Sequence, residues 1–378
     1  MESNKINVLH ICSYYIGNRL YKNLVENLNI VGIGQTVYVP IKDRKLMGFH
    51  KVNNNNIPII YSPILKKYHR FMYFSKVRKT MIDIENKINL NSNINVVHAH
   101  TLFSDGGAAY LIKKKYGIKY IVNIRNTDIN SFLKYGVHLR RFMIRILLEA
   151  EKVVFLSPSY IPKLLEKVPL NMVEDIMNKV TWIPNGIENH WLDSELNLKN
   201  LKEKSLNIIQ VGGLNKNKNA ETTIELVKRL KDNDIKANLL IIGKGPQEDI
   251  LKEMCVNKKL DNVDFAGHIS DAIKLKGMYE KSDIFILPSF KETFGIVYVE
   301  AMASGLPILY SRNQGIDGYF EEGKVGYSID PYSVKDIENK LFQVIERYND
   351  ISRSAKLESY NFKWEVIAKK YMDLYELI

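Results

Sequence analysis

One stretch of thirty residues, 281–310, restricts the possible folds of this chain more than any other. It reads KSDIFILPSFKETFGIVYVEAMASGLPILY. The short apolar run at 284–287, with a proline directly after it, predicts a buried parallel strand that ends in a loop. Residues 295–303 are apolar on nearly all sides and stop before Gly305, which predicts a short buried helix. A second strand is predicted at 308–310, so the stretch forms a strand–loop–helix–strand unit of a doubly wound α/β sheet.

Two glutamates lie in this stretch, Glu292 in the loop after the first strand and Glu300 inside the helix. Open α/β sheets bind ligands at the carboxyl ends of their strands, and this is where Glu292 is expected. Residues 293–297 between them would present unpaired backbone N–H groups at a helix N-terminus, which is an anion site. A structural alternative stays open, with Glu292 solvated near the helix dipole and Glu300 a buried structural carboxylate. Burying Glu300 in an apolar helix is costly without a partner, and ligand hydroxyls would be suitable partners.

The two glutamates and their context, ETFG followed by AMASGLPI, resemble the GT-B glycosyltransferases of the retaining family 4 type (glycosyl transferases group 1). The resemblance implies an α/β fold of two Rossmann-like doubly wound domains that face each other across a cleft, with a C-terminal helix crossing back to the first domain. It also implies that Glu292 contacts hydroxyls of the donor sugar and that Glu300 contacts the ribose hydroxyls of the nucleotide. The backbone amides expected to hold the sugar and the diphosphate are those of Phe294, Gly295, Ile296 and Val297.

Three loops of the second half would complete the donor site, because glycines after a strand let the backbone approach phosphate. By resemblance, Gly213 and Lys218 stand where the family has an arginine and a lysine that clamp the diphosphate, so half of the clamp is kept. Lys216 is a candidate for the missing charge. Gly243 opens a second close-approach loop, and Ile269 lies in a third loop where the family reads the nucleotide base with backbone groups.

Further candidates lie in the first half of the chain. Gly17 follows the first predicted strand, in a loop that is usually glycine-rich in the family and lies beside the diphosphate, so we count it as a donor contact. Arg125 stands where the family commonly has a histidine near the reacting sugar. An arginine is no general base at neutral pH, but it can neutralise a phosphate. We therefore group Arg125 with Glu292 as catalytic and expect Asp128 to contact the acceptor, with a helix N-cap by Asp128 as the structural alternative.

No metal site is expected. We assign His98 and His100 to opposite faces of their strand, so that they would not chelate one ion together, and expect His100 to project toward the acceptor. A metal-dependent GT-A enzyme would need an Asp-x-Asp motif after a strand, whereas residues 232–234 (Asp-Asn-Asp) are predicted in a turn between a helix and a strand. Cys12 and Cys255 are interpreted as small buried hydrophobes, without a disulfide framework or a metal cluster.

The length of 378 residues suits two domains. We expect residues 1–187 to form an N-terminal acceptor-side domain and residues 188–355 to form the nucleotide-sugar-binding domain. Residues 356–378 would form the C-terminal helix that packs back on the first domain. The turn PNGI at 184–187 resembles the family's crossover into the second domain.

The net charge of +12 is placed unevenly. Residues 1–187 contain 27 Lys and Arg against 12 Asp and Glu, a net +15, whereas the remainder has 27 against 30, a net −3. The segment 66–82 mixes cations with aromatic rings and, with a second basic segment at 138–145, predicts an interfacial helix on an anionic membrane surface. An ordinary solvated helix face is the alternative. No nucleic-acid motif is present, and no apolar run is long enough to span a membrane, so we expect a cytoplasmic protein on the inner face of the membrane.

These patterns favour a retaining, metal-independent hexosyltransferase without a cofactor. Its co-substrate would be a nucleotide-diphospho sugar, and its acceptor a hydroxyl of a glycan or polyprenyl-linked molecule in bacterial surface polysaccharide or glycolipid synthesis. Two other classes stay open. One is a sugar-phosphate phosphorylase or nucleotide-sugar epimerase of the same fold, and the other is a non-enzymatic basic binding protein.

Overall fold

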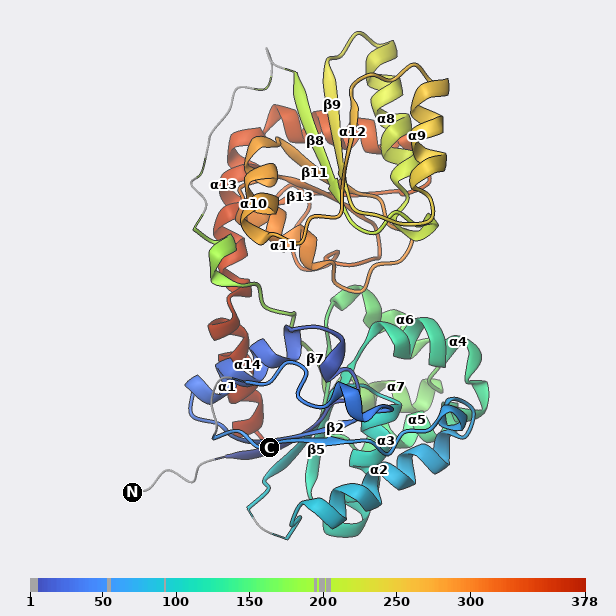
Figure 1. Ribbon diagram of the computed structural model, residues 1–378, viewed down its shortest axis with the longest axis vertical. Coiled ribbons are helices and arrows are strands. Elements are labelled where there is room, and N and C mark those ends of the chain that lie inside the picture. Colours follow the sequence, from blue (N-terminus) through green and yellow to red (C-terminus); the bar gives the residue numbers. More distant parts are fainter. Residues whose placement is uncertain (1–5, 53–55, 92, 194–195, 197–200, 202–204) are drawn as a thin grey trace. The chain divides into compact units, whose positions relative to one another are not determined.

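The computed structural model describes residues 6–52, 56–91, 93–193, 196, 201 and 205–378 (Figure 1). The chain divides into two compact units. Unit 1 consists of Met1–Leu156, Tyr160–Gly186 and Trp364–Ile378, and unit 2 consists of Ser157–Ser159 and Ile187–Lys363. The boundary expected at 355/356 falls inside a helix of unit 2, α13 (Tyr348–Ser359), so unit 2 continues to Lys363.

Unit 1 is built on a seven-stranded sheet in the order β3-β2-β1-β4-β5-β6-β7, in which every neighbouring pair is parallel. The strands are β1 (Asn7–Ile11), β2 (Gly34–Pro40), β3 (Ile59–Ser62), β4 (Val96–Ala99), β5 (Lys119–Ile124), β6 (Lys152–Phe155) and β7 (Val180–Trp182). The helices are α1 (Leu20–Ile30), α2 (Tyr73–Lys87), α3 (Ser104–Tyr116), α4 (Leu133–Tyr135), α5 (Arg140–Glu149), α6 (Ile161–Leu165), α7 (Leu170–Met177) and α14 (Trp364–Glu376).

Successive residues of the central strands enter two different cores, because neighbouring side chains of a strand point to opposite faces. Val97 and Val122 pack into one core with α2, α3 and α5, whereas Val96 and Ile121 pack into the other with α1 and α14. The last helix therefore completes the second face of this sheet, as Figure 1 shows for α1 and α14. Continuous apolar strands are what a parallel sheet covered on both faces requires.

Unit 2 is built on a six-stranded sheet in the order β10-β9-β8-β11-β12-β13, again with every neighbouring pair parallel. The strands are β8 (Leu206–Val211), β9 (Ala237–Ile242), β10 (Val263–Gly267), β11 (Ile284–Leu287), β12 (Ile308–Ser311) and β13 (Gly326–Ile329). The helices are α8 (Ala220–Asp232), α9 (Glu248–Asn257), α10 (Ala272–Lys281), α11 (Ile296–Ala303), α12 (Val334–Glu346) and α13. Within the described residues, no helix is both long and apolar enough to cross a membrane.

The structure confirms the elements predicted for 281–310 as β11, α11 and β12. Two strands had no clear signal in the sequence, β3 and β13, and each is a four-residue edge strand of its sheet. The single helix expected over 66–82 was wrong. A 3₁₀ turn at Lys67–Arg70 comes first, and α2 begins only at Tyr73 because Met72, with φ −96° and ψ 71°, interrupts the helical backbone.

Candidate active site

The candidate donor site of unit 2 lies at the point where the order in which the chain adds strands to the sheet reverses. From β8 the chain proceeds outward through β9 and β10, and it then returns to place β11 on the other side of β8. Loops after β8 and β11 therefore diverge at the carboxyl edge of the sheet, which is where doubly wound folds bind ligands. Lys218 follows β8 and Glu292 follows β11, and the Lys218 ammonium forms an ion pair with the Glu292 carboxylate. Both side chains stay within reach of solvent, at 22% and 14% exposure.

The loop around Glu292 holds its side chain on several sides. Glu292 Oε1 accepts a hydrogen bond from the Thr293 amide at 3.2 Å, and the Glu292 amide donates to Gln314 Oε1 at 3.3 Å. Gly295 and Gly315 have φ of +76° and +55° and lie against Glu292. A Cβ on either glycine would lie 3.1 or 3.0 Å from Glu292 Cγ, closer than ordinary packing allows. Glycine at both positions therefore leaves space for this carboxylate.

Helix α11 begins directly beside Glu292. Gly295 is its N-cap in the left-handed conformation, a backbone geometry that suits glycine. The first-turn amides of a helix have no partner inside the helix, and this end carries the positive end of the helix dipole. Phe294 is buried, whereas Gly295, Ile296 and Val297 are partly exposed, so the helix N-terminus can meet a ligand. The structure thus brings the expected amides together with Lys218 and Glu292.

Glu300 lies one turn further along α11 and is partly buried. Burial raises its pKa to about 7, the hydrogen bond from Tyr279 partly offsets this rise, and the charge of Glu188 adds to it. The Tyr279 hydroxyl is 3.5 Å from Glu300 Oε2, which is a long hydrogen bond. This carboxyl is therefore only partly ionised at neutral pH and retains capacity to accept ligand hydroxyls.

The glycine loops after β8 and β9 are interlocked through their backbones. The amide of Gly212 donates to Ile242 O at 2.9 Å, and the amide of Leu214 donates to Lys244 O at 3.0 Å. Gly243 has φ +151°, and a Cβ there would lie 1.9 Å from Gly212 O, so only glycine fits.

The remaining predicted donor residues of unit 2 are more open than Gly243. Gly213 is exposed, and a Cβ there would meet nothing closer than 3.4 Å. Lys216 is exposed in the 3₁₀ turn that also contains Lys218. Ile269 is partly exposed in the loop after β10. All of them belong to loops at the same edge of the sheet as Lys218.

Asparagines that the sequence reasoning missed hold the loop of Lys218 in place. Asn217 Nδ2 donates to Lys291 O at 2.8 Å, and the Phe290 amide donates to Asn217 O at 2.9 Å. Asn219 Nδ2 donates to the carbonyls of Pro288 and Pro331 at 3.1 and 2.8 Å. These bonds tie the loop after β8 to the loops after β11 and β13. In sequence they are visible only as an asparagine-lysine run, which is common in surface turns.

In unit 1, Arg125 follows β5 and is held from three sides. Its Nε donates to His100 O at 3.3 Å, and its Nη1 donates to Asn185 Oδ1 at 3.3 Å. The guanidinium carbon lies 5.3 Å from the centre of the Tyr21 ring. The side chain is partly exposed, so this rigidly oriented cation is available to a ligand.

Asp128, which was expected to contact the acceptor substrate, is buried and does not face solvent. Its carboxylate is buried and accepts backbone hydrogen bonds from Leu102 at 3.0 Å, Phe103 at 3.2 Å and Arg125 at 2.9 Å. Burial raises its pKa to about 6, and the three amides lower it in part. Asp128 therefore ties the loop after β4 to the loop after β5. Gly17, by contrast, is exposed in a 3₁₀ turn after β1, with open space where a Cβ would be.

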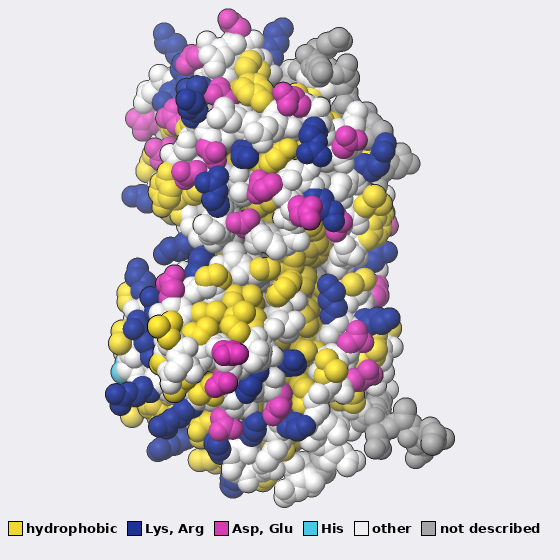
Figure 2. All heavy atoms as spheres, turned by 180° about the vertical axis from the view of Figure 1, so that it is seen from behind, with side chains coloured by type: hydrophobic (Ala, Val, Ile, Leu, Met, Phe, Trp, Pro, Cys, Tyr) yellow, Lys and Arg dark blue, Asp and Glu magenta, His cyan; other side chains and the backbone are white. Residues whose placement is uncertain are grey.

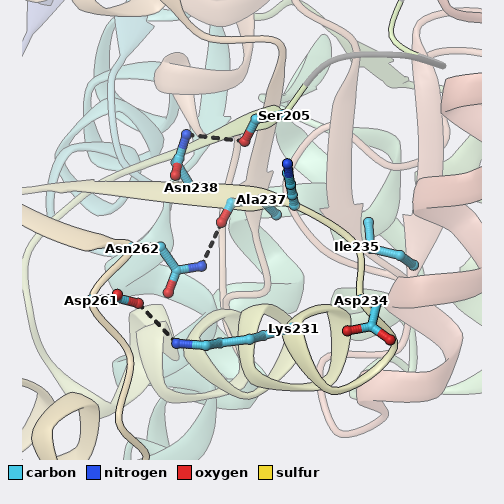
Figure 3. A pocket seen from close by; sticks show the side chains of 9 residues that line it. Ser205, Lys231, Asp234, Ile235, Ala237, Asn238, Asp261 and Asn262 are labelled. Atoms are coloured by element: carbon cyan, nitrogen blue, oxygen red, sulfur yellow. Dashed lines mark hydrogen bonds and ion pairs between the residues drawn. The ribbon is translucent and has the colours of Figure 1, made fainter.

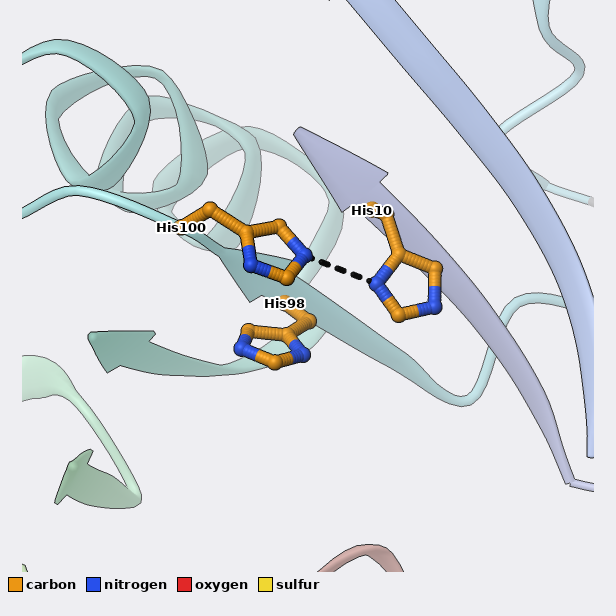
Figure 4. Close-up of side chains that lie close together, drawn as sticks. All are labelled: His10, His98 and His100. Atoms are coloured by element: carbon orange, nitrogen blue, oxygen red, sulfur yellow. Dashed lines mark hydrogen bonds between the residues drawn. The ribbon is translucent and has the colours of Figure 1, made fainter. Parts of the chain in front are cut away.

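The assignment of His98 and His100 to opposite faces was wrong, because strand residues two apart share a face. Their rings stack with centroids 4.0 Å apart, and both are buried, so His100 does not project outward (Figure 4). His10 Nδ1 lies 3.0 Å from His100 Nε2, and nitrogens of all three rings lie within 4.8 Å of one another. His98 Nε2 donates to Asn123 Oδ1 at 3.0 Å, so His98 Nδ1 accepts from the Tyr375 hydroxyl at 2.7 Å.

This histidine cluster is a poor cation site as it stands. A metal ion would have to displace the Tyr375 hydroxyl from His98 Nδ1, because the other nitrogen of that ring already bonds Asn123 Oδ1. Since Tyr375 belongs to α14, the hydrogen bond instead links the last helix to the sheet of unit 1.

A cavity of about 380 Å³ in unit 2 lies at the wrong edge of the sheet for the donor site, among residues that precede β8, β9 and β10 (Figure 3). Its polar groups bind one another, since Asn238 Nδ2 donates to Ser205 Oγ at 3.3 Å and Lys231 pairs with Asp261 at 2.9 Å. Asp234, the last residue of the Asp-x-Asp sequence, lines this cavity. That motif is therefore remote from the loops of Lys218 and Glu292.

Residues 194–364, which contain every donor-side loop of unit 2, match the model of the family described as Glycosyl transferases group 1. The chain carries a group 1 glycosyltransferase domain. Relatives extend the likeness over nearly the whole length of this glycosyltransferase. The N-acetyl-alpha-D-glucosaminyl L-malate synthase of Bacillus anthracis is 23% identical to it, covering 95% of this chain and 92% of its own length. The alpha-monoglucosyldiacylglycerol synthase of Acholeplasma laidlawii is 26% identical, covering 93% and 91%.

Solved structures give the same fold for this glycosyltransferase. The Anabaena protein HepE, solved in complex with UDP, aligns with a TM-score of 0.72 at 16% identity, covering 99% of this chain and all of HepE. The glycosyltransferase therefore has the GT-B fold, with two sheets of seven and six parallel strands.

Proposed function

We propose that this glycosyltransferase transfers a hexose from a nucleotide-diphospho sugar to a hydroxyl of a glycan or lipid-linked acceptor, with retention of configuration at the anomeric carbon. It would act in the synthesis of bacterial surface polysaccharide or glycolipid. Two names support the proposal. One relative is an alpha-monoglucosyldiacylglycerol synthase, whose name describes a glycolipid product, and the structural neighbour HepE was solved with UDP.

One observation carries the proposal, the ion pair of Lys218 and Glu292 beside the N-terminus of α11. The nucleoside diphosphate that leaves carries roughly two to three negative charges. A cation next to a helix N-terminus can bind and stabilise it. When the donor binds, its diphosphate would compete for Lys218 and release Glu292 to accept hydroxyls of the sugar. Glu300 would then accept the ribose hydroxyls, and Arg125 would neutralise negative charge on donor or acceptor.

The transfer itself would need no protein base beside the anomeric carbon. The bond between this carbon and the leaving phosphate oxygen breaks first, and the acceptor oxygen bonds to the same face of the sugar. The acceptor proton passes to the departing phosphate oxygen. This ion-pair-like substitution depends on stabilising the leaving group, which is the task of Lys218 and the amides of α11.

The proposal is tested by incubating the chain with UDP-, GDP- and ADP-hexoses and following sugar release by NMR. We expect one donor to be hydrolysed slowly in the absence of an acceptor, with the first-formed sugar retaining the donor's anomeric configuration. The rate should be unchanged by EDTA, because the Lys218 ammonium supplies the positive charge at the leaving group. No release from any donor, or inversion at the anomeric carbon, would contradict the proposal.

We also propose that unit 1 attaches to the inner, anionic face of the cell membrane from the cytoplasm. Cationic side chains and apolar side chains intermingle on its visible surface (Figure 2), and Phe71 before α2 is 83% exposed. Such rings and cations suit a phospholipid interface. We expect the chain to sediment with phosphatidylglycerol vesicles, and to do so less at high salt. Phe71→Ser should weaken this sedimentation. The control is Leu170→Ser, because Leu170 is 92% exposed on α7, and it should have a smaller effect. Equal sedimentation with neutral vesicles would refute the attachment.

A further inference from the structure

Unit 1 contains a cavity of about 330 Å³ that the proposed function has not used. Its lining comes from loops that follow neighbouring strands. Tyr14 follows β1, Lys42 follows β2, Lys66 and Arg70 follow β3, and Ser104 follows β4. These strands are adjacent in the order β3-β2-β1-β4, so the cavity lies at the carboxyl edge of the sheet and includes its switch point between β1 and β4. This is the edge at which such sheets bind ligands.

The cavity is cationic. Lys42, Lys66, Arg70 and Lys76 all line it, and its lining contains no carboxylate. Among the residues that the structure describes, none of the first three forms an ion pair, and Lys76 Nζ donates to Ser104 Oγ at 2.7 Å. Four cations in a lining without a carboxylate repel one another, so an anion between them would relieve that repulsion.

Two buried carboxylates outside the lining, Asp105 and Asp128, act on Lys76. Asp105 acts on Lys76, but it also accepts a hydrogen bond from Ser13 Oγ at 2.5 Å. Burial lowers the pKa of Lys76, the charge of Asp105 opposes this, and the charge of Lys42 lowers the pKa further against a smaller opposing effect of Asp128. The cations therefore act on one another within the cavity.

His69, which also lines the cavity, is affected by the positive charges around it. It is 5% exposed, and its Nδ1 accepts a hydrogen bond from the Lys66 amide at 3.0 Å. In this arrangement Nε2 carries the proton, and it has no partner among the described residues. Burial lowers the pKa of His69, and the charges of Lys79, Lys76 and Lys66 lower it further.

The rest of the lining is apolar or aromatic, with Leu65, Tyr73 and Phe132 beside Tyr14. Such walls suit the body of a ligand, whereas the cations suit a charged group on it. A phosphate ester carries up to two negative charges and several acceptor oxygens, so it matches four cations better than a single carboxylate would. The volume is also within the range of small-ligand pockets.

We propose that this cavity binds a phosphate or diphosphate group of the acceptor, so that the sugar is transferred to a phosphorylated molecule. The inference rests on the proposed function and specifies its acceptor class. The phosphate could belong to a lipid-linked acceptor or to a soluble sugar phosphate, and both present the same oxygens to Lys42, Lys66, Arg70 and Lys76.

Calorimetric titration of the full chain with geranyl phosphate and with glucose 1-phosphate tests the inference, with geraniol and glucose as uncharged probes. We expect a phosphorylated probe to bind and its uncharged counterpart not to bind. The double variant Lys66→Ala/Arg70→Ala should lose about tenfold or more in affinity for the phosphorylated probe, because charge-assisted hydrogen bonds are removed. The matched variant Lys67→Ala/Arg78→Ala removes the same charge outside the cavity and should change affinity by less than about twofold.

The outcomes separate the possible sources and the possible failures. Tighter binding of geranyl phosphate supports a lipid-linked acceptor, and tighter binding of glucose 1-phosphate supports a soluble one. No binding of either probe, or equal losses in the two double variants, overturns the inference. Hydrolysis of the UDP-, GDP- and ADP-hexoses, measured on the same samples, decides the proposed function independently, since Lys66 and Arg70 belong to unit 1 and the donor loops to unit 2.

Discussion

Glu292→Gln should reduce the rate of sugar transfer by about 100-fold or more while leaving the fold intact. The amide has the shape of the carboxylate but no charge, so it would hold neither Lys218 nor the sugar hydroxyls with the same strength. Nucleotide affinity should change much less, because Lys218 remains free to bind the diphosphate. Steady-state kinetics with the preferred donor, together with titration of its nucleoside diphosphate, would show this as a loss in kcat with a small change in Kd.

A matched control for this prediction is Glu321→Gln, which removes the same charge from an exposed position of unit 2 and should retain the wild-type rate. Lys218→Ala should also be severely impaired. Because Lys218 and Glu292 form one ion pair, we expect the double variant to lose less than the product of the two single losses. Wild-type turnover by Glu292→Gln would refute the role assigned to this carboxylate.

Gly243→Ala should destabilise unit 2 by about 3 kcal/mol or more, which corresponds to a fall of about 6–12 °C in its unfolding midpoint. The added Cβ would lie 1.9 Å from Gly212 O, and that atom belongs to backbone that is itself hydrogen-bonded to Ile242. Relief would therefore require the two glycine loops to separate. The same separation would disturb the loop that carries Lys218, so binding of the donor's nucleoside diphosphate should weaken as well. Thermal unfolding with and without the nucleoside diphosphate of the preferred donor measures both effects.

The control for Gly243→Ala is Gly213→Ala in the neighbouring loop. Its Cβ would approach the Asn215 side-chain amide at 3.4 Å and Lys244 O at 3.8 Å, and its backbone is not left-handed. We expect a change of about 1 kcal/mol or less in the free energy of unfolding. Equal destabilisation by the two substitutions would show that the contact between Gly243 and Gly212 does not determine the stability of this loop.

Sequence reasoning worked best where local patterns and tertiary environment agreed. The apolar run of β11 predicted that strand with its observed limits, because a strand buried on both faces needs continuous apolar residues. The prediction was wrong for His98 and His100. Residues two apart in a strand lie on the same face, and the two rings stack. The prediction was also wrong for the segment 66–82, where composition predicted a helix but the backbone at Met72 divides it.

The sequence by itself determined the strand–loop–helix–strand unit of 281–310, the glycine at the start of α11, and the spacing between Glu292 in the loop and Glu300 on that helix. These depend on residues close together in the chain, where backbone geometry and periodicity act directly. Only the tertiary structure decided which distant groups meet. Lys218 reaches Glu292 across 74 positions because β8 and β11 are neighbours in the sheet, and Lys42, Lys66 and Lys76 share one cavity because β2 and β3 end at the same edge. Strand order is set by packing of the whole sheet, and no local pattern encodes it.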